Sequence, residues 1–198
     1  MKGAPSESRR EILRAAARLF QERGYDATSM QDIASALNFS KAALYHHFES
    51  KEEILQQIMT YGMDIFEQRV QLAVTDMPDA EARLRACIAL HIELVISGHD
   101  REITVILHEN RTLQSDAGRA INARKKSYIV FLAGLIAEVQ TARGLKHATV
   151  TAQPAAFALL GMINWMYQWY RSEGNLSEAE IVRQYTALFF QGAFAASL

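Results

Sequence analysis

Apolar residues recur every three or four positions along almost the whole chain, and this spacing constrains the fold more than any other feature. Such a period puts apolar side chains on one face of an α-helix, whereas a half-buried strand needs alternation with period two. No stretch of the sequence alternates convincingly in that way. Proline, which breaks helices, occurs only at Pro5, Pro78 and Pro154. We therefore predict an all-α protein.

Capping residues predict where the helices begin and end. A serine or threonine followed three residues later by glutamate or glutamine forms a capping box, and four such pairs occur, at Ser8 and Glu11, Thr28 and Gln31, Ser50 and Glu53, and Ser177 and Glu180. Ser40 is predicted to cap a further helix, and Gly24 to end the first. The predicted helices span 8–23, 28–37, 41–47, 50–70, 79–97, 101–109, 116–143, 151–171 and 177–195.

Length and composition indicate a cytoplasmic protein with a small head and a larger body. The 198 residues are 49% hydrophobic and 22% charged, as in ordinary globular proteins. The N-terminus lacks a signal pattern, and the longest apolar stretch, 155–167, is too short to span a bilayer. The single cysteine, Cys87, forms no internal disulfide, which agrees with a reducing compartment. Arg83 and Arg85 nearby leave a redox-sensing role open, beside the ordinary interpretation of Cys87 as a small apolar helix residue.

The first 51 residues contain two short helices joined by a tight turn, which is typical of a helix-turn-helix. Asn38 suits the turn because asparagine tolerates left-handed backbone. The inner side is predicted to bury Leu37, Phe39, Leu44 and Phe48. The residues left exposed on the third helix offer a cation, a methyl group, a phenol and an imidazole, all suited to phosphates or base edges: Lys41, Ala42, Tyr45 and His46.

The charge distribution adds little, and helix-turn-helix patterns are also frequent by chance. The net charge is −1; residues 1–51 hold 8 basic against 6 acidic side chains, and residues 52–198 hold 13 against 16. A two-charge excess favours nucleic acid only where the basic groups share one face.

The residues themselves closely resemble the DNA-binding head of the TetR (tetracycline repressor) family. The resemblance covers about residues 8–60 and is carried by segments 28–34, 37–48 and 50–53, with LYHHF-x-S-K at 44–51 as its most specific part. Arg18-Leu19-Phe20 and Gly24-Tyr25 fit the same pattern. Asn38 departs from it, because many relatives carry glycine there, but asparagine is tolerated for the backbone reason above.

This resemblance implies a DNA-binding domain over residues 1–51 and gives its side chains roles. Thr28 and Ser29 would bind phosphates, Ala42 would approach a thymine methyl group, and Lys51 would clamp the DNA backbone. Lys41, Tyr45, His46 and His47 would be the contacts of the recognition helix. A metal site at His46 and His47 is rejected, because adjacent helical residues point about 100° apart.

Residues 52–198 are predicted to form a helical ligand-binding and dimerisation domain. Its many apolar residues form a core or line a lipophilic cavity. Burying a polar group costs free energy unless the group is paired, so polar residues within these helices should pair with one another or with a ligand. They are His91, His108, Glu109, Asn110, Arg111 and Asn164.

Segments 107–113 and 161–177 look like the C-terminal domain of acyl-CoA-responsive members of this family. That resemblance implies an acyl-CoA ligand, with a non-CoA lipophilic compound of an efflux regulator as the alternative. The predicted ligand-binding residues are His91, His108, Arg111, Met162, Asn164, Trp165 and Trp169. A CoA phosphate would seek cations such as Arg111, Arg124, Lys125 or Arg171, although 124–126 equally fit a solvated helix face.

The last two long helices are apolar on more than one side, which predicts burial on both sides. Pairing with a symmetry mate would form a four-helix bundle, a homodimer and hence a palindromic operator. The residues assigned to this surface are Phe157, Leu160, Ile163 and Trp169 on one helix, and Tyr185, Leu188, Phe189 and Phe194 on the other. Gly62 is predicted to let the long helix that follows the head bend.

No catalytic motif, phosphate-binding glycine loop or metal-spaced cluster occurs, so the sequence predicts a DNA-binding regulator without enzymatic activity, cofactor or metal. It is interpreted as a repressor released from its operator by a small hydrophobic ligand. Three alternatives stay open: an enzyme using His91, His108 and Glu109 as acid–base groups, a ligand-binding protein that has lost DNA binding, and an activator of the same architecture.

Overall fold

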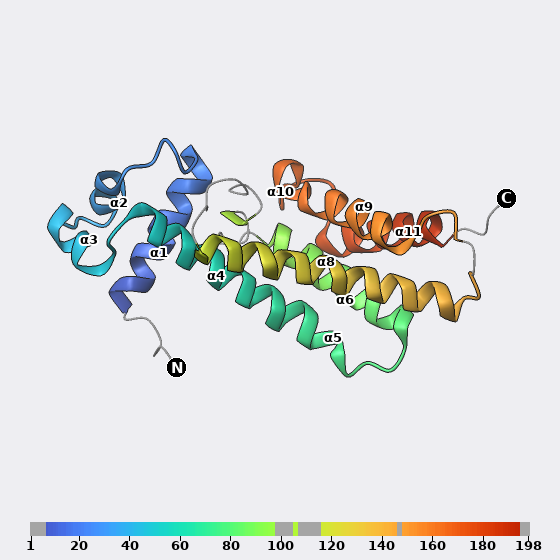
Figure 1. The fold of residues 1–198 in the computed structure, drawn as a ribbon. Coiled ribbons are helices and arrows are strands. Elements are labelled where there is room, and N and C mark those ends of the chain that lie inside the picture. The colour runs from blue at the N-terminus through green and yellow to red at the C-terminus, as the bar shows by residue number, and fades with distance from the viewer. Residues whose placement is uncertain (1–6, 98–104, 107–115, 146–147, 195–198) are drawn as a thin grey trace. The chain divides into compact units, whose positions relative to one another are not determined.

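The computed structural model describes residues 7–97, 105–106, 116–145 and 148–194, and helices are the only regular elements in these ranges. The prediction of an all-α fold is confirmed (Figure 1). The elements, in chain order, are α1 (Glu7–Arg23), α2 (Met30–Ala36), α3 (Lys41–His47), α4 (Lys51–Phe66), η1 (Glu67–Leu72), α5 (Ala73–Thr75), α6 (Ala80–Ile96), α8 (Asp116–Ala142), α9 (Ala152–Asn164), α10 (Met166–Trp169) and α11 (Glu178–Ala193).

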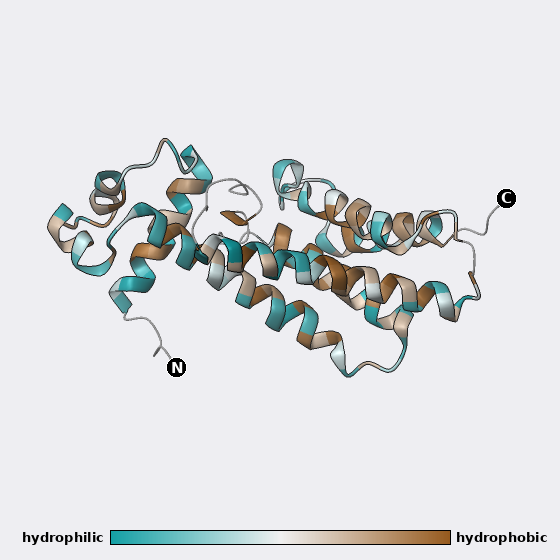
Figure 2. Ribbon diagram, viewed as in Figure 1, coloured by the Kyte–Doolittle hydropathy of each residue, from teal (hydrophilic) through white to brown (hydrophobic). Residues whose placement is uncertain are grey.

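The chain forms two compact units. The first comprises Met1–Asp64 and Asp100–Asn122, and the second comprises Ile65–His99 and Ala123–Leu198. All of the predicted DNA-binding domain, residues 1–51, falls in the first unit. Both α4 and α8 contribute residues to both units. Apolar and polar residues are mixed along each of these two helices (Figure 2).

The first unit is built around an apolar core to which α1, α2, α3 and α4 all contribute. α1 is amphipathic, and its apolar residues at helical spacing face this core. Those of its members that are essentially inaccessible are Ile12, Ala16, Ala17, Ile33, Ala34, Leu44, Phe48, Ile54, Leu55, Ile58 and Val105. Leu37 and Phe39 of the turn pack against it as partly buried residues.

Two left-handed residues set the chain direction between these helices, as predicted. Gly24 follows α1 with φ of 86°, and Asn38 follows α2 with φ of 56°. Asparagine is one of the few residues with a side chain that enter this region readily. Ser40 then caps α3 by accepting a hydrogen bond from the Ala43 N–H at 3.1 Å.

The predicted capping boxes are only partly correct. The box of Ser177 and Glu180 is complete, and the hydroxyl of Ser50 accepts the Glu53 N–H at 3.1 Å. The box at the start of α2 is one residue later than predicted, with Ser29 and Asp32 in place of Thr28 and Gln31. Ser8 lies inside α1, which begins at Glu7, so it is not the residue that precedes the helix.

In the second unit, α6 packs against η1, α5, α9, α10 and α11. The predicted helix 50–70 continues as α4, but residues 67–72 form a π-helix, a form that is rare except as short insertions. The predicted helix 151–171 is wrong as a single element. It breaks at Trp165, and the chain leaves α10 at Tyr170 with ψ of 137°. The predicted helix 101–109 lies largely outside the described residues.

Among the residues that the structure describes, no helix combines the length and the apolar character that crossing a membrane would require.

Candidate DNA interface and ligand site

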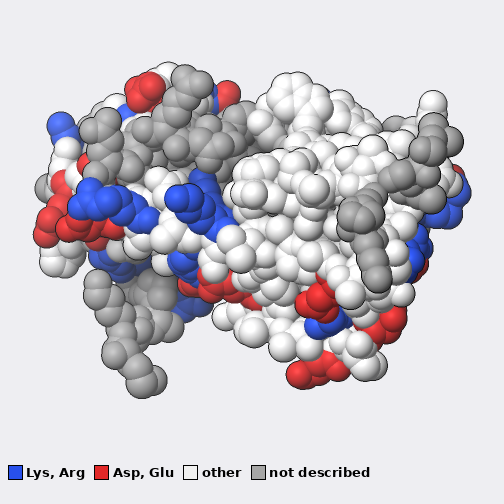
Figure 3. All heavy atoms as spheres, turned by 45° about the vertical axis from the view of Figure 1, so that its right-hand side comes forward, with Lys and Arg blue, Asp and Glu red and all other residues white. Residues whose placement is uncertain are grey.

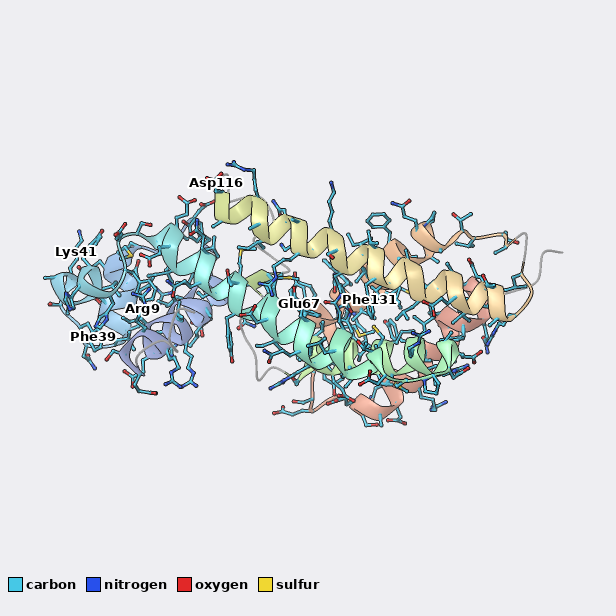
Figure 4. All side chains as sticks on the ribbon, turned by 60° about the horizontal axis from the view of Figure 1, so that its bottom comes forward. Arg9, Phe39, Lys41, Glu67, Asp116 and Phe131 are labelled. Atoms are coloured by element: carbon cyan, nitrogen blue, oxygen red, sulfur yellow. The ribbon has the colours of Figure 1, made fainter. Side chains whose placement is uncertain are left out.

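The outer face of α3 carries the side chains that the sequence predicted to contact DNA. Lys41, Ala42, Tyr45 and His46 are exposed, while Leu44 on the opposite face is fully buried in the core of the first unit. The ammonium group of Lys41 lies 5.9 Å from the centre of the Tyr45 ring, and Lys41 extends outward in Figure 4. The face thus offers hydrogen-bond donors, an acceptor and a methyl group together.

Ser29 is exposed at the N-terminus of α2, where backbone N–H groups attract anions. Its hydroxyl accepts the Asp32 N–H at 3.1 Å, and the Asp32 carboxylate accepts the Ser29 N–H at 2.8 Å. The hydrogen bonds from Ser29 lower the pKa of Asp32, which is therefore ionised. This carboxylate occupies part of the helix terminus that the sequence assigned to a DNA phosphate.

Thr28, a predicted phosphate ligand, has its side chain buried in the head, and its contact with DNA stays a prediction. Its side chain is 1% exposed, and its single hydroxyl hydrogen points to the carbonyl oxygens of Gly24, at 2.9 Å, and Leu19, at 3.4 Å. Its backbone N–H donates to the carbonyl of Tyr25 at 3.2 Å. Both donors of Thr28 are therefore used inside the head, where they fix the loop between α1 and α2.

Lys51, the predicted clamp on the DNA backbone, is likewise directed into the head, and its contact with DNA stays a prediction. Its Nζ donates to the carbonyls of Tyr25 and Thr28, each at 2.7 Å, and lies 4.1 Å from the centre of the Tyr25 ring. Two of its three N–H groups are thus engaged. Lys51 attaches the first turn of α4 to the loop that precedes α2.

The adjacent His46 and His47 meet edge to face, with ring centres 5.5 Å apart. His47 is half-buried, and its carbonyl accepts a hydrogen bond from the guanidinium of Arg9. No group of three potential metal ligands occurs in the described part of the chain. His46 is thus the more available of the two for a DNA contact.

The second unit contains a chain of hydrogen bonds between buried polar side chains. Nε2 of His91 lies 3.1 Å from Oδ1 of Asn164, and Nδ1 lies 2.9 Å from the hydroxyl of Tyr128. The Tyr128 hydroxyl is also 3.9 Å from Sγ of Cys87. Because Oδ1 of Asn164 can only accept, Nε2 carries the proton and Nδ1 accepts from Tyr128. The Cys87 thiol then donates to the Tyr128 oxygen.

Burial keeps every member of this chain neutral. It lowers the pKa of His91 from 6.5 to about 4, and it raises the pKa of Cys87 to about 12 and that of Tyr128 well above 10. A protonated, buried thiol is a poor nucleophile, which favours the ordinary interpretation of Cys87 over redox sensing. The sequence indicated His91 and Asn164 as buried polar residues that need partners, but it did not indicate Tyr128. A tyrosine on an apolar helix face looks like an ordinary core residue in the sequence.

Two of the other predicted ligand residues, Trp165 and Trp169, lie at the surface of the protomer. Trp165 and Trp169 are 62% and 40% exposed, and Trp169 stacks on Tyr185 of α11. Met162 is half-buried. His108 and Arg111, with Glu109 and Asn110, lie outside the described residues.

The cations proposed for a CoA phosphate are also partly engaged. Nε of Arg124 donates to the Glu67 carboxylate at 2.7 Å, and this bond lowers the pKa of Glu67. Lys125 is half-buried, and burial lowers its pKa to about 8. The exposed Arg171 donates to the carbonyls of Gln168 and Tyr170. Residues 124–126 are therefore neither a purely solvated face nor an open phosphate site.

A cavity of about 480 Å³ opens to solvent on the second unit, which is within the size range of small-molecule sites. Leu90, Leu94 and Ile96 of α6 supply its apolar part. Arg69 of η1 and residues of α6, α11 and the segment after α10 supply its polar part. The polar lining residues are Arg69, Glu93, Ser97, Tyr170, Ser172 and Glu178.

The comparisons with known proteins agree with this architecture. Residues 12–58 match the family model described as bacterial regulatory proteins, tetR family, and residues 77–193 match that of the tetracyclin repressor-like C-terminal domain. The HTH-type transcriptional repressor KstR2 of Rhodococcus jostii is 27% identical over 188 residues, which cover 94% of this chain and 91% of that protein.

A solved structure of AibR in complex with isovaleryl coenzyme A and operator DNA is 41% identical to the chain, with a TM-score of 0.86. The match covers 94% of this chain and all of that one. Apo AibR is 40% identical, with a TM-score of 0.79, over 91% and 97% of the two chains. The two family models together span most of the sequence. The chain therefore belongs to the TetR family of bacterial transcription regulators and is a ligand-responsive, DNA-binding regulator.

Proposed function

We propose that the protein is a cytoplasmic, homodimeric repressor that binds a palindromic operator through α3 and releases it when an acyl-CoA binds the second unit. The observation that carries the DNA part is the exposed face of α3, with Lys41, Ala42, Tyr45 and His46 on a helix whose other side is fixed in the core. Lys41 would bind phosphate, Tyr45 and His46 would reach phosphate or base edges, and Ala42 would meet a thymine methyl group. Ser29 and His47 would contribute at the margins.

Replacing Lys41 by alanine is expected to weaken binding to every DNA sequence and to lower the slope of log affinity against log salt by about one. Lys126→Ala is the matched control, since Lys126 is an exposed lysine of the second unit. The probe is a duplex that the wild-type protein selects from a random pool, titrated at several salt concentrations. An unchanged slope for Lys41→Ala, or an equal change for Lys126→Ala, would show that α3 is not the DNA-binding surface.

The acyl-CoA part of the proposal is supported by the relative that binds isovaleryl coenzyme A and by the cavity on the second unit. Leu90, Leu94 and Ile96 suit an acyl chain, and Ser97 and Tyr170 suit the amides of a pantetheine arm. Glu93 and Glu178 would repel the CoA phosphates, so we place only the uncharged acyl and pantetheine portion in the cavity. A non-CoA lipophilic ligand is the alternative occupant.

An acyl-CoA is expected to lower operator affinity by a finite factor. The AibR structure holds its thioester and operator DNA together, so in that protein the two ligands are not mutually exclusive. Release then requires the ligand to favour the conformation that binds DNA weakly, and a factor of about a hundred is within the usual range of such coupling. Titrating the protein–DNA complex with acyl-CoAs of several lengths, the matching free acids and free CoA measures this factor.

Leu90→Trp should fill the cavity and abolish the response, while operator affinity in the absence of ligand stays at the wild-type value. If no thioester changes DNA affinity and an unrelated lipophilic compound does, the acyl-CoA assignment is wrong. If the thioester strengthens DNA binding, the protein is not the repressor proposed here. If Leu90→Trp responds normally, the ligand binds elsewhere in the protein.

A further inference from the structure

Arg9 of α1 contacts three residues in and after α3, namely His47, Phe48 and Glu53. Its Nη1 donates to the carbonyl of His47, the last residue of α3. Its guanidinium carbon lies 4.1 Å from the centre of the Phe48 ring. Its Nη2 pairs with Oε1 of Glu53 at 3.1 Å. Arg9, although it lies on α1, is thus bound to both α3 and α4; Figure 4 labels it on the first unit together with Phe39 and Lys41.

Glu53 of α4 receives hydrogen bonds from the same region. Besides Arg9, its Oε1 accepts from Nε2 of Gln57 at 3.1 Å, and its Oε2 accepts the backbone N–H of Glu49 at 2.8 Å. The Glu49 N–H belongs to the segment between α3 and α4. The Arg9–Glu53 pair therefore holds the two residues on either side of Phe48, through the His47 carbonyl and the Glu49 N–H.

These contacts matter because α3 is only seven residues long. So short a helix has little stability of its own, and packing fixes its orientation. On its inner side, α3 itself buries Leu44 alone, with Phe48 following at its end. A planar guanidinium that donates to the His47 carbonyl and also stacks on the Phe48 ring restrains rotation of α3 about its axis. Such a rotation would move the outward side chains of Tyr45 and His46.

We propose that Arg9 is a positioning residue for DNA reading, which fixes the rotation of α3 through His47, Phe48 and Glu53 without touching DNA. The inference rests on the proposed role of α3 as the recognition helix. The side chain of Arg9 is 28% exposed and its guanidinium points into the head. Loss of Arg9 should therefore weaken binding to the operator more than binding to other sequences. Loss of a phosphate contact would instead weaken binding to the operator and to other sequences alike.

The test compares Arg9→Gln, Arg9→Lys and Arg10→Gln on the selected duplex and on a scrambled duplex of the same length. Arg9→Gln is expected to lower operator affinity about tenfold, the usual scale for losing hydrogen bonds to a charged group, with the scrambled duplex and the salt slope unchanged. Arg9→Lys should recover only part of this loss, because a lysine cannot span three partners. Arg10→Gln removes the same charge from an exposed neighbour that pairs with Glu7 in its own helix, and should leave discrimination unchanged.

A double-mutant cycle with Glu53→Gln makes the inference falsifiable even if one variant is less stable. The double variant should discriminate between the two duplexes about as well as Arg9→Gln alone, because each substitution removes the same Arg9–Glu53 connection. Additive losses would show that Arg9 and Glu53 act independently and would overturn the inference. A salt slope lowered by about one in Arg9→Gln would also overturn it, because Arg9 would then be a phosphate contact. If Lys41→Ala leaves DNA binding intact, the proposed role of α3 fails first. If only the Arg9 variants behave as wild type, this inference alone fails.

Discussion

Leu188→Glu is expected to give a folded monomer, whereas Phe189→Glu at the next position is expected to unfold the second unit. The side chain of Leu188 is 59% exposed in the protomer, and that of Phe189 is 4% exposed. A glutamate at position 188 therefore meets solvent unless a partner subunit covers it. A glutamate at position 189 would place an unpaired charge among Phe190 and Phe194, at a cost of about 3–5 kcal/mol.

A second exposed apolar surface, on α9, also has the character of a subunit interface. The chain carries no charged residue between positions 151 and 170, and α9 nevertheless leaves an outward stripe uncovered. That stripe repeats at helical spacing and consists of Pro154, Phe157, Ala158, Gly161 and Trp165. Figure 3 shows a broad area of the second unit without acidic or basic side chains. Exposed apolar patches of this kind mark sites of association.

Sedimentation at several concentrations and circular dichroism together check the pair of variants. Leu188→Glu should keep wild-type helicity, sediment as a monomer and bind the selected duplex roughly a hundredfold more weakly, because two linked heads gain avidity that one head lacks. Arg183→Glu, at an exposed position of the same helix, controls for added negative charge. A Leu188→Glu protein that sediments like the wild type would place the dimer interface on a different surface.

The contrast also corrects the surface predicted from the sequence. Phe189, Phe194 and Ile163 were assigned to the dimer interface, yet all three are buried within the protomer. A helix that is apolar on several sides is buried on several sides, but periodicity does not say which side faces its own chain. Leu188 and Phe157, which were assigned to the same interface, are exposed in the protomer, and their role in dimerisation stays a prediction.

In the head, local rules predicted most of the structure. The bounds of α3, its Ser40 cap, the left-handed Asn38 and the buried Leu44 follow from capping and spacing alone. The contacts of Thr28 and Lys51 within the head were not predicted, because a family pattern identifies positions without showing what their side chains contact. Thr28 donates to the carbonyls of Leu19 and Gly24, and Lys51 donates to those of Tyr25 and Thr28. No periodicity indicates that a cation will bind carbonyls more than twenty residues away in the sequence.

In the second unit, the helices were predictable but their side-chain partners were not. Each end of α6 and α8 lies within one residue of its predicted position. The π-helix of η1 and the break at Trp165 could not be predicted, because neither position carries a proline or glycine. The requirement that buried polar groups pair correctly indicated that His91 needs partners. Only the fold shows that Tyr128 and Asn164 supply them.

The buried His91 is expected to make the protein less stable below about pH 6.5. Burial lowers its pKa to about 4 in the folded protein from an ordinary value of 6.5, so the unfolded chain binds a proton that the folded protein excludes. Stability therefore rises with pH across this window. The contribution is complete above pH 6.5 and is lost progressively as the pH falls toward 4, by about 3 kcal/mol in total.

His91→Gln separates this effect from the carboxylates that also weaken the protein in acid. The arginine partners of Glu67 and Glu81 lower the pKa of both carboxylates, so each loses its ion pair as the pH falls, in wild type and variant alike. Glutamine retains a donor and an acceptor toward Asn164 and Tyr128 but does not titrate. Urea unfolding at fixed protein concentration, from pH 7.5 to 4.5, should give a free energy of unfolding that falls about 2–3 kcal/mol more in the wild type than in His91→Gln. Parallel curves would mean that His91 takes up protons in the folded protein as readily as in the unfolded chain. The neutral chain from Cys87 to Asn164 could then not be the arrangement that stabilises the second unit.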